Sequence, residues 1–593
     1  MARNKFDVDE ALESSFNKGM LIRLMEYIKP YKTELSITVL IMLIASFATL
    51  LGPYLVKVAM DDKIVNKDIK GLIFLSVIFI ITLIVNGICI KHKTRIMSFV
   101  GQDIVFNIRQ DLFAHLQKLP FSYYDSRPHG KILVRVVNYV NSLSDLLSNG
   151  IINLATDLFS LFVILGFMLF IDVRLTLIAM AGLPFLAIII FSLKGRQRRA
   201  WQQYSNKNSN LTAYIHESIC GIKVTQSFAR EDENMNIFDE QCQQNKINWM
   251  KAKMIDAILN PSIEVISAFT TSLLYISGLF WLGGSVTIGV LIAFLAYSHR
   301  FWQPIMNISN FYNAIITNMA YLERIFEVMD EIPVVTDSKD ATIMPEIKGD
   351  VEFKNVNFSY EDGHTILEDV SFKVSQGESI ALVGPTGAGK STIVNLISRF
   401  YNLNSGEILI DGVDISKVKL NLLRKQMGIM LQDTFIFSGN IMDNIRYGRL
   451  DARDEEVIEA ARAVCAHKFI SELEDGYYTE VNERGTRLSV GQRQLISFAR
   501  ALLANPKILI LDEATSSIDT ETEIALQKGL DRLLQGRTSF VIAHRLSTIK
   551  NSSRIMYVSD KNIAESGTHD ELIDGKGAYH NLYTSQFSFI ESL

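Results

Sequence analysis

The stretch "LIFLSVIFIITLIVNGICI", residues 72–90, carries no charged side chain along its whole length. A helix of about 20 apolar residues is long enough to cross the hydrocarbon core of a bilayer. The alternative is a buried helix of a large soluble protein, but such a helix normally keeps one polar face toward water. The stretch therefore predicts a membrane-spanning helix.

Five further segments of similar length are also predominantly apolar, at residues 35–60, 151–171, 175–193, 257–282 and 286–317. The connecting stretches 91–149 and 194–256 are long and rich in Lys and Arg, whereas little more than "GGS" joins the last two segments. Loops with an excess of Lys and Arg stay on the cytoplasmic side. We therefore expect a multi-pass protein of the cell membrane, with both long loops and both termini in the cytoplasm.

The long loops carry helical patterns such as "DIVFNIRQDLFAHLQKL", so we expect membrane helices that continue into the cytosol. The stretch "KGMLIRLMEYIKPYK" combines apolar and basic residues at helical spacing, which is typical of a helix lying along the inner membrane surface. Residues 1–15 lack the apolar core of a cleavable signal peptide, so insertion is expected through internal segments.

Pro333 and Pro345 interrupt the helical pattern after the sixth span and predict a linker. From about Gly349, apolar strands alternate with helical stretches, which indicates an α/β domain. The expected order is a tail with an interfacial elbow helix at residues 1–34, a transmembrane domain with two long cytoplasmic loops at 35–325, a linker at 326–348 and the α/β domain at 349–593.

The sequence "GPTGAGKST", residues 384–392, follows the predicted strand "SIALV" and opens the predicted helix "STIVNLISRF". G-x-x-x-x-G-K-S in this context is a phosphate loop, and the context argues against a chance glycine-rich turn. Its backbone N–H groups surround phosphate oxygens, Lys390 reaches the terminal phosphates and Ser391 ligates Mg²⁺. The predicted nucleotide contacts are Gly384, Pro385, Thr386, Gly387, Ala388, Gly389, Lys390, Ser391 and Thr392.

The apolar run "ILIL" ends in two adjacent acids, Asp512 and Glu513. It resembles the second strand of a P-loop NTPase, in which the first acid holds Mg²⁺ through water and the second polarises the attacking water. Two acids at a strand end also occur where a solvated loop begins, but the phosphate loop upstream favours the catalytic interpretation. ATP and Mg²⁺ are the expected cofactors.

The sequence "LSVGQ", residues 488–492, resembles the signature motif of ABC ATPases. Six spans followed by one nucleotide-binding domain resemble, over essentially the whole chain, a bacterial multidrug-type ABC exporter half-transporter. The resemblance implies an all-α six-helix transmembrane domain followed by a cytosolic α/β P-loop ATPase domain, with residues 349–593 as the ABC nucleotide-binding domain.

The resemblance also implies roles for single residues. Tyr360 would stack on adenine, Gln432 in "MLQD" would lie near Mg²⁺, "SSID" would be the D-loop, and His544 would be the switch histidine. Taken singly, a tyrosine, glutamine or histidine is more often structural, but these follow one another in the family's order. The implied catalytic residues are Glu513, His544 and Gln432, and the implied metal ligands are Ser391, Gln432 and Asp512.

Val490 stands where glycine is commonest and Ile518 where leucine is commonest, and neither change removes a reactive group. The resemblance therefore implies ATP hydrolysis. It also implies a dimer, because the signature residues Ser489, Gly491 and Gln492 would close over the nucleotide of a second nucleotide-binding domain. The run "LSVGQRQLISFARA" looks most like the catalytically intact subunit of a heterodimer, so a second half-transporter is the favoured partner, although a homodimer stays open.

"FSYYDSRPHGKILVRV" and "ESICGIKVTQSFAREDE" resemble the cytoplasmic loops whose short helices dock on nucleotide-binding domains. "EVNERG", residues 480–485, resembles the X-loop that senses those helices. Tyr139 in "VNYVN" stands where the family often has an Asn-Asp pair, which puts that local contact in question.

Four amides on the sixth span, Gln303, Asn307, Asn310 and Asn313, share one helix face. Amides avoid lipid because it leaves them unpaired, so this stripe either lines a translocation cavity or binds helices together. Asp157 and Glu264 also lie inside spans, where a charge costs about 3 kcal/mol. They are candidate contacts for a cationic substrate.

The function expected from these features is ATP-driven export of small amphipathic compounds, drugs or lipids, by alternating access. A dedicated peptide or lipid exporter and an ATP-gated channel or regulator are the alternatives. The net charge of −5 gives no reason to propose a nucleic-acid partner. Four scattered cysteines predict neither a disulfide framework nor a zinc site.

Overall fold

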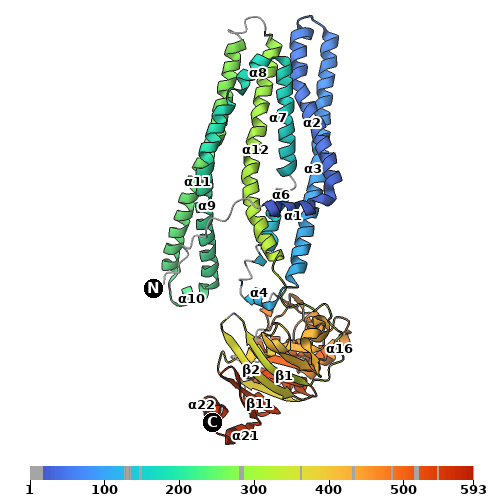
Figure 1. Ribbon diagram of the computed structural model, residues 1–593, viewed down its shortest axis with the longest axis vertical. Coiled ribbons are helices and arrows are strands. Elements are labelled where there is room, and N and C mark those ends of the chain that lie inside the picture. Colours follow the sequence, from blue (N-terminus) through green and yellow to red (C-terminus); the bar gives the residue numbers. More distant parts are fainter. Residues whose placement is uncertain are drawn as a thin grey trace. The chain divides into compact units, whose positions relative to one another are not determined.

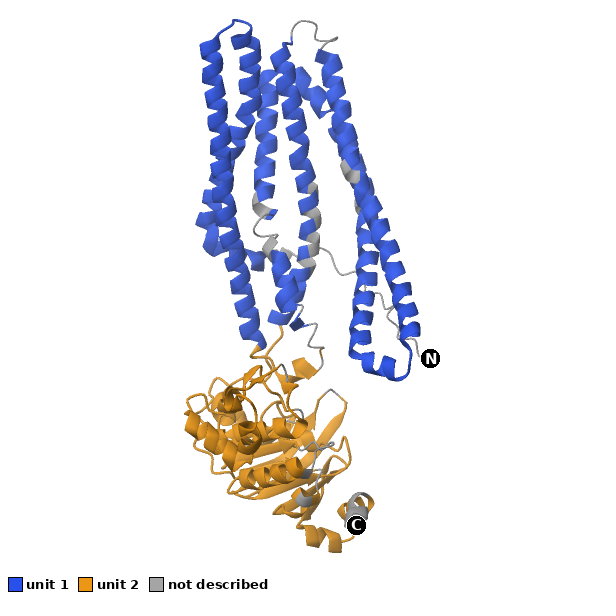
Figure 2. Cartoon of the chain, turned by 180° about the vertical axis from the view of Figure 1, so that it is seen from behind, with its two compact units in different colours: residues 1–116, 130–330 blue, residues 117–129, 331–593 orange. Residues whose placement is uncertain are grey.

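The structure is a computed structural model that describes residues 18–125, 127, 132–133, 135–145, 150–278, 286–360, 363–430, 434–482, 485–512, 520–543 and 546–591. It divides into two compact units, residues 1–116 with 130–330 and residues 117–129 with 331–593 (Figure 2). A short piece of the first long loop therefore belongs with the second unit.

The described part of the first unit is helical (Figure 1). Its elements are α1 (Lys18–Ile28), η1 (Lys29–Tyr31), α2 (Lys32–Val58), η2 (Ala59–Ile64), α3 (Ile69–Leu116), η3 (Arg135–Tyr139), α6 (Val140–Asp145), α7 (Ile151–Ile171), α8 (Val173–Met180), α9 (Leu183–Cys220), α10 (Ile222–Ser227), α11 (Glu231–Ile276) and α12 (Ile288–Met329). The predicted spans fall on helices in the described chain, except that the span at 175–193 is divided between α8 and α9. Helices α3, α9 and α11 continue far beyond the predicted spans.

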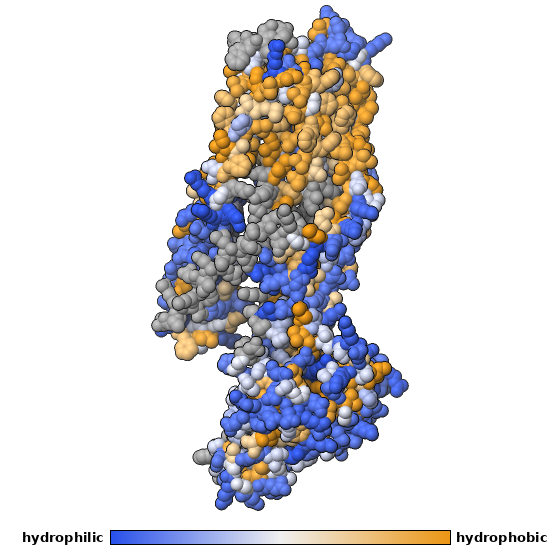
Figure 3. All heavy atoms as spheres, in the orientation of Figure 1, coloured by the Kyte–Doolittle hydropathy of each residue, from blue (hydrophilic) through white to orange (hydrophobic). Residues whose placement is uncertain are grey.

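Five helices of the described chain are long and apolar enough to cross a membrane: Ile22–Ile64, Ile69–Leu116, Asn153–Ile171, Val173–Cys220 and Glu231–Ile276. Their exposed apolar side chains form the broad orange band of Figure 3. A water-exposed apolar surface of this size would be unfavourable, whereas lipid solvates it. The first unit is a multi-pass membrane domain.

The sixth predicted span is α12, which is not among those five candidates in the described chain. Its polar side chains lower its hydropathy, and some of them bond to neighbouring helices. The Arg300 guanidinium donates to the carbonyl of Thr49 on α2 at 2.6 Å. Because α12 contacts α2, α7 and α11, it lies within the bundle (Figure 1).

The amide stripe on α12 has a mixed outcome. Gln303 Nε2 donates to Asn307 Oδ1 at 3.2 Å, and Asn307 Nδ2 donates to Asp157 Oδ1 on α7 at 3.3 Å. Asn307 therefore binds helices together, while Gln303 and Asn310 are exposed on the single chain. The side chain of Asn313 lies outside the described residues.

The second unit contains α4 (Phe121–Asp125) and three sheets. The strands are β1 (Val351–Ser359), β2 (Thr365–Val374), β3 (Ser379–Val383), β4 (Ser405–Ile410), β5 (Val413–Asp414), β6 (Met427–Met430), β7 (Gly439–Asn440), β8 (Glu480–Val481), β9 (Ile508–Asp512), β10 (Thr538–Ile542), β11 (Arg554–Ser559) and β12 (Asn562–Gly567). The sheet orders are β2-β1-β4-β5, β12-β11-β3-β10-β9-β6 and β7-β8.

The helices of this unit are α13 (Lys390–Ile397), η6 (Ile415–Lys417), α14 (Leu420–Arg424), α15 (Ile441–Arg446), α16 (Asp454–Ala463), α17 (His467–Ser471), η7 (Gly476–Tyr478), α18 (Val490–Ala504), α19 (Thr520–Leu534), α20 (Leu546–Lys550), α21 (His569–Asp574) and α22 (Ala578–Glu591). Two hydrophobic cores lie on either side of the six-stranded sheet. One contains α13 and the antiparallel sheet, and the other contains α15, α16, α18 and α19. The predicted α/β domain is confirmed.

Candidate functional site

The phosphate loop connects β3 to α13, and three of its glycines have left-handed backbone angles. The φ values are 142° at Gly384, 83° at Gly387 and 104° at Gly389. Side chains are strained in this region, so the loop depends on glycine. At Gly384 a Cβ atom would also lie 2.2 Å from the carbonyl oxygen of Val558, so the loop is packed closely against β11.

Lys390, the first residue of α13, folds back over the loop. Its Nζ donates to the carbonyl oxygens of Gly384 and Pro385, both at 2.8 Å. Burial lowers the pKa of this ammonium, and the nearby Asp512 carboxylate opposes the shift. Ser391 follows in the first turn of α13 and is exposed. A cation and a helix N-terminus at one loop fit a polyphosphate ligand.

The neighbouring parallel strands bring Asp512 to the same sheet edge. β10 pairs in parallel with β3 and with β9, and Asp512 is opposite Ile542. The carboxyl ends of parallel strands form one edge, where open α/β sheets bind ligands. The Ser391 hydroxyl and the Asp512 carboxylate are oxygen ligands of the kind that Mg²⁺ takes, so both residues fit the predicted metal site.

Gln432, Glu513 and His544 lie outside the described residues, as do the D-loop and part of the X-loop. The strands before the three residues are nevertheless described. β6 ends at Met430, β9 at Asp512 and β10 at Ile542, and all three are parallel neighbours in one sheet. Each predicted residue therefore follows the carboxyl end of a strand at the edge that carries the phosphate loop.

The signature begins α18. The Ser489 hydroxyl accepts from the Gln492 backbone N–H at 3.2 Å, and the Gln492 side chain accepts from the Ser489 N–H at 2.9 Å. This reciprocal capping box occupies the Gln492 oxygen, which was predicted to contact nucleotide. Gly491 is buried, and Ser489 is exposed at the helix start.

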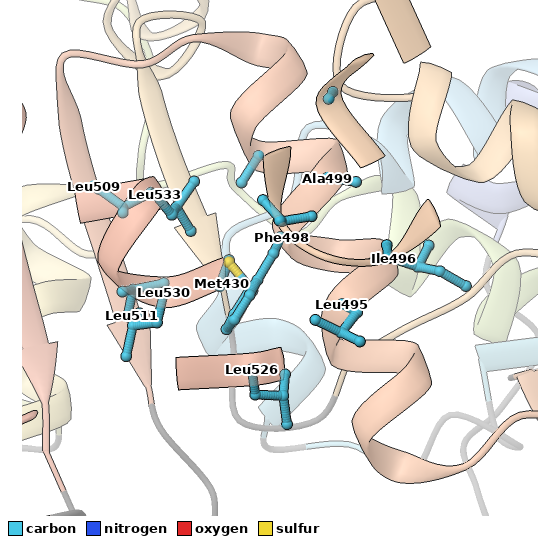
Figure 4. Packing of buried hydrophobic residues seen from close by; sticks show 14 of the residues in the cluster. Met430, Leu495, Ile496, Phe498, Ala499, Leu509, Leu511, Leu526, Leu530 and Leu533 are labelled. Atoms are coloured by element: carbon cyan, nitrogen blue, oxygen red, sulfur yellow. The ribbon is translucent and has the colours of Figure 1, made fainter. Parts of the chain in front are cut away.

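The packing of α18 explains how the chain holds this motif. Leu495 and Phe498 of α18 lie in one cluster with Leu511 of β9 and with Leu526 and Leu530 of α19 (Figure 4). The signature and the phosphate loop are thus attached to different cores on one sheet. A buried strand such as β9 both fixes α18 and presents Asp512 at its end.

Arg500 of α18 was not identified from the sequence. Its guanidinium donates to the carbonyls of Asn444 and Phe435 at 2.8 and 3.1 Å and to Asn444 Oδ1 at 3.1 Å. These bonds tie α18 to the segment that follows Gln432. The sequence signal for this role was an arginine inside an otherwise apolar helical pattern, which indicates a charged side chain with partners inside the domain.

Tyr360, which is predicted to stack on adenine, also has contacts that the sequence did not indicate. Its ring is edge-on to Phe358 at 4.8 Å and to Tyr401 at 5.0 Å, and its hydroxyl shares a hydrogen bond of 3.1 Å with the buried Thr392 hydroxyl. Thr392 thus positions Tyr360 beside the phosphate loop. About half of Tyr360 is exposed, which leaves room for a stacked base.

The first-loop helix α4 packs on the same unit. The Phe121 ring lies 4.4 Å from the Phe400 ring, and the Asp125 carboxylate accepts a hydrogen bond from the Tyr401 hydroxyl. The prediction that a short helix of the first loop docks on the nucleotide-binding domain is confirmed. Tyr139, in the same loop but in the membrane unit, stacks on Tyr321 at 4.7 Å instead of supplying an Asn-Asp contact.

Comparisons with known proteins agree with this architecture. Residues 35–305 match the ABC transporter transmembrane region, and residues 367–516 match the ABC transporter ATPase family, described as "ABC transporter". The chain is 44% identical over 593 residues to the ABC transporter ATP-binding protein YknV of Bacillus subtilis (strain 168), covering 99% of this chain and 98% of that protein. The chain belongs to the ABC transporter family.

Two other similarities extend this result. The chain is 35% identical over 588 residues to the ATP-dependent lipid A-core flippase of Syntrophus aciditrophicus (strain SB), covering 99% of this chain and 98% of that protein. It is also similar to the structure of a bacterial Atm1-family ABC exporter with ATP bound, with a TM-score of 0.81 and 28% identity. The match covers 94% of this chain and 98% of that chain. This protein is an ABC exporter that binds ATP and couples ATP hydrolysis to transport.

Proposed function

We propose that this ABC exporter moves small amphipathic compounds, drugs or lipids, out across the cytoplasmic membrane, with its ATPase domain and both termini in the cytoplasm. The observation that carries the proposal is a phosphate loop and Asp512 at one sheet edge of a domain fused to a large apolar helical unit. The names of relatives support the cargo class. One is a lipid A-core flippase, and YgaD of Bacillus subtilis (strain 168), 38% identical over 581 residues, has a name that points to multidrug export.

In the proposed mechanism, ATP supplies the phosphoryl group, and the residues of this chain bind and orient it. Tyr360 stacks on the base, and Lys390 neutralises phosphate charge. Ser391, Asp512 and Gln432 would hold Mg²⁺, which would neutralise phosphate charge when bound. Glu513 orients water as general base, and His544 contacts the terminal phosphate.

We further propose that the site is completed by a second half-transporter. Helix α18 packs into the core opposite the phosphate loop, and Ser489 is exposed at its start, so the Ser489 hydroxyl and the backbone beside it are available to contact nucleotide bound to another domain. The arm formed by α9 and α11 ends in α10, where Ile219, Val224 and Phe228 are 67%, 62% and 73% exposed. Apolar side chains at a cytosolic tip support a protein partner.

For the cargo, we propose contacts with the polar group around Asp157. One Asp157 oxygen accepts from Asn307, and the other is buried without a hydrogen-bond partner within the described chain. A buried carboxylate oxygen without a hydrogen-bond partner is costly, and the Lys93 ammonium interacts with Asp157 by charge only while it donates to Asn153 at 2.5 Å. A cationic amphipathic compound supplies such a partner, whereas Glu264 is exposed on the single chain and is a weaker candidate.

The test is transport by purified protein in proteoliposomes, with ethidium and a headgroup-labelled phospholipid as probes. The parent is expected to move at least one probe in an ATP-dependent manner. Glu513→Gln should keep ATP binding and lose about 100-fold or more of its hydrolysis, because the amide lacks the basic oxygen. Glu523→Gln, an exposed acid on α19, is the matched control and should behave as the parent. ATP-dependent ion conductance without transport of either probe would contradict the exporter proposal and favour a channel.

A further inference from the structure

Two adjacent residues after the phosphate-loop helix hold the two ends of α4. The Phe400 ring packs at a tilt against the Phe121 ring at the start of α4, and the Tyr401 hydroxyl donates to the Asp125 carboxylate at its end. Arg424 lies over the Phe400 ring at 4.9 Å and donates to the carbonyl of Arg399 at 2.7 Å. Phe400 therefore holds the start of α4 and is itself held in place by Arg424.

Tyr401 differs from Phe400 because it also touches the adenine residue. Its ring is perpendicular to that of Tyr360, with centroids 5.0 Å apart, and Phe358 packs edge-on against both rings. Tyr360 in turn bonds Thr392 of α13. A continuous line of contacts thus runs from the phosphate-loop helix through Tyr360 and Tyr401 to Asp125.

The position of Asp125 at the end of α4 favours a hydrogen-bond donor from outside that helix. A carboxylate at the last residue of a helix lies near carbonyls that carry partial negative charge, so it favours a donor from outside the helix. The Tyr401 hydroxyl is that donor. Burial, followed by the Asp125 hydrogen bond, raises the pKa of Tyr401 above its usual value, so the hydroxyl keeps its proton at working pH.

We propose that Tyr401 is a positioning residue that reports occupancy of the adenine site to α4, so that base binding, and not phosphate binding alone, orders the first cytoplasmic loop. A base stacked on Tyr360 restricts the motion of that ring. The edge-to-face contact then restricts Tyr401, whose hydroxyl holds Asp125. This inference rests on the proposed ATP site.

The test is hydrogen–deuterium exchange of the α4 segment in the full-length protein in nanodiscs. A non-hydrolysable ATP analogue with Mg²⁺ should slow exchange in the parent by about threefold or more, because local opening becomes rarer. Inorganic triphosphate, which has no base, should have a much smaller effect. Tyr401→Phe should keep analogue affinity within about twofold and lose most of the slowing, since only the bond to Asp125 is removed.

Asp125→Ala removes the hydrogen-bond acceptor from the other side and should reproduce the Tyr401→Phe result. Tyr478→Phe is the matched control, because the Tyr478 hydroxyl donates to Asp454 at 3.0 Å elsewhere in the domain. Equal slowing in Tyr401→Phe and parent, or equal slowing by triphosphate and the ATP analogue, would refute the inference. Absence of analogue binding to the parent would instead refute the proposed ATP site.

Discussion

Lys390 illustrates how a single side chain can hold a loop in place and also carry the charge expected to recognise phosphate. Its ammonium bonds two loop carbonyls, which keeps the positive charge inside the cradle. We expect Lys390→Ala to weaken ATP binding by at least about tenfold, because a charge-assisted contact to phosphate is lost. Equilibrium binding of a fluorescent ATP analogue measures this. Lys417→Ala, at an exposed residue paired with Asp414, is the control, and unchanged affinity in Lys390→Ala would contradict the phosphate-loop assignment.

A substitution at Gly384 tests whether the geometry of the phosphate loop matters for ATP binding as much as the charge of Lys390. A methyl group there meets the Val558 carbonyl at 2.2 Å, whereas Gly377 also has a positive φ, 78°, but nothing within 4 Å of its added Cβ. We expect Gly384→Ala to destabilise the domain by about 2 kcal/mol or more and to weaken ATP binding, and Gly377→Ala to cost about 1 kcal/mol. Thermal unfolding and nucleotide binding of the full chain measure both. Similar losses in the two variants would show that backbone strain, and not the clash, dominates.

Among the elements, α18 links the signature to the segment after Gln432 through Arg500. We expect Arg500→Lys to lower the first thermal unfolding midpoint by about 4–8 °C, because a lysine cannot replace three hydrogen bonds and leaves carbonyls unpaired. Arg532→Lys on α19 changes an arginine that pairs with Gln535 and is the control. A melting curve equal to that of the parent would mean that water replaces the guanidinium.

Sequence patterns predict elements best where one local signal decides the structure. Helix α7 coincides with a predicted span because its window is predominantly apolar, and the phosphate loop is positioned by its glycines. The predicted span at 175–193 is instead interrupted at Ala181 and Gly182, between α8 and α9. Pro184 begins a new helix there, and hydropathy averaging over a window does not register such a break.

Contacts between distant segments are the part that the sequence does not predict. The Tyr401 to Asp125 bond joins residues 276 positions apart, and the Arg300 bond to Thr49 joins residues 251 positions apart. Periodicity contains information about the face of one helix but not about the partner of that face. This is why the sequence left open whether the amide stripe binds helices together or lines a cavity, and why it did not show the bond between Asn307 and Asp157.

At the scale of the whole molecule, the tip of the α9–α11 arm exposes apolar side chains in a region expected to be cytosolic. Phe228 is 73% exposed there. We expect Phe228→Ser to reduce ATP hydrolysis by about tenfold, because docking on a partner domain would lose the burial of one aromatic side chain, about 1.5–3 kcal/mol. Leu450→Ser, at a residue that is 78% exposed, is the control and should leave the rate unchanged. Equal rates in both variants would mean that the arm tip is not an interface.

The identity of the partner remains a prediction from the signature helix, whose sequence looks most like the intact subunit of a heterodimer. In the proposed dimer each ATP site takes Ser489 and Gly491 from a second domain, so a chain with the wrong partner would align them poorly. We expect the purified chain alone to hydrolyse ATP slowly and a co-expressed second half-transporter to raise the rate. Native mass spectrometry of membrane extracts, with parallel ATPase assays, measures both. A stable homodimer with full, cargo-stimulated hydrolysis would contradict the heterodimer and leave the exporter function intact.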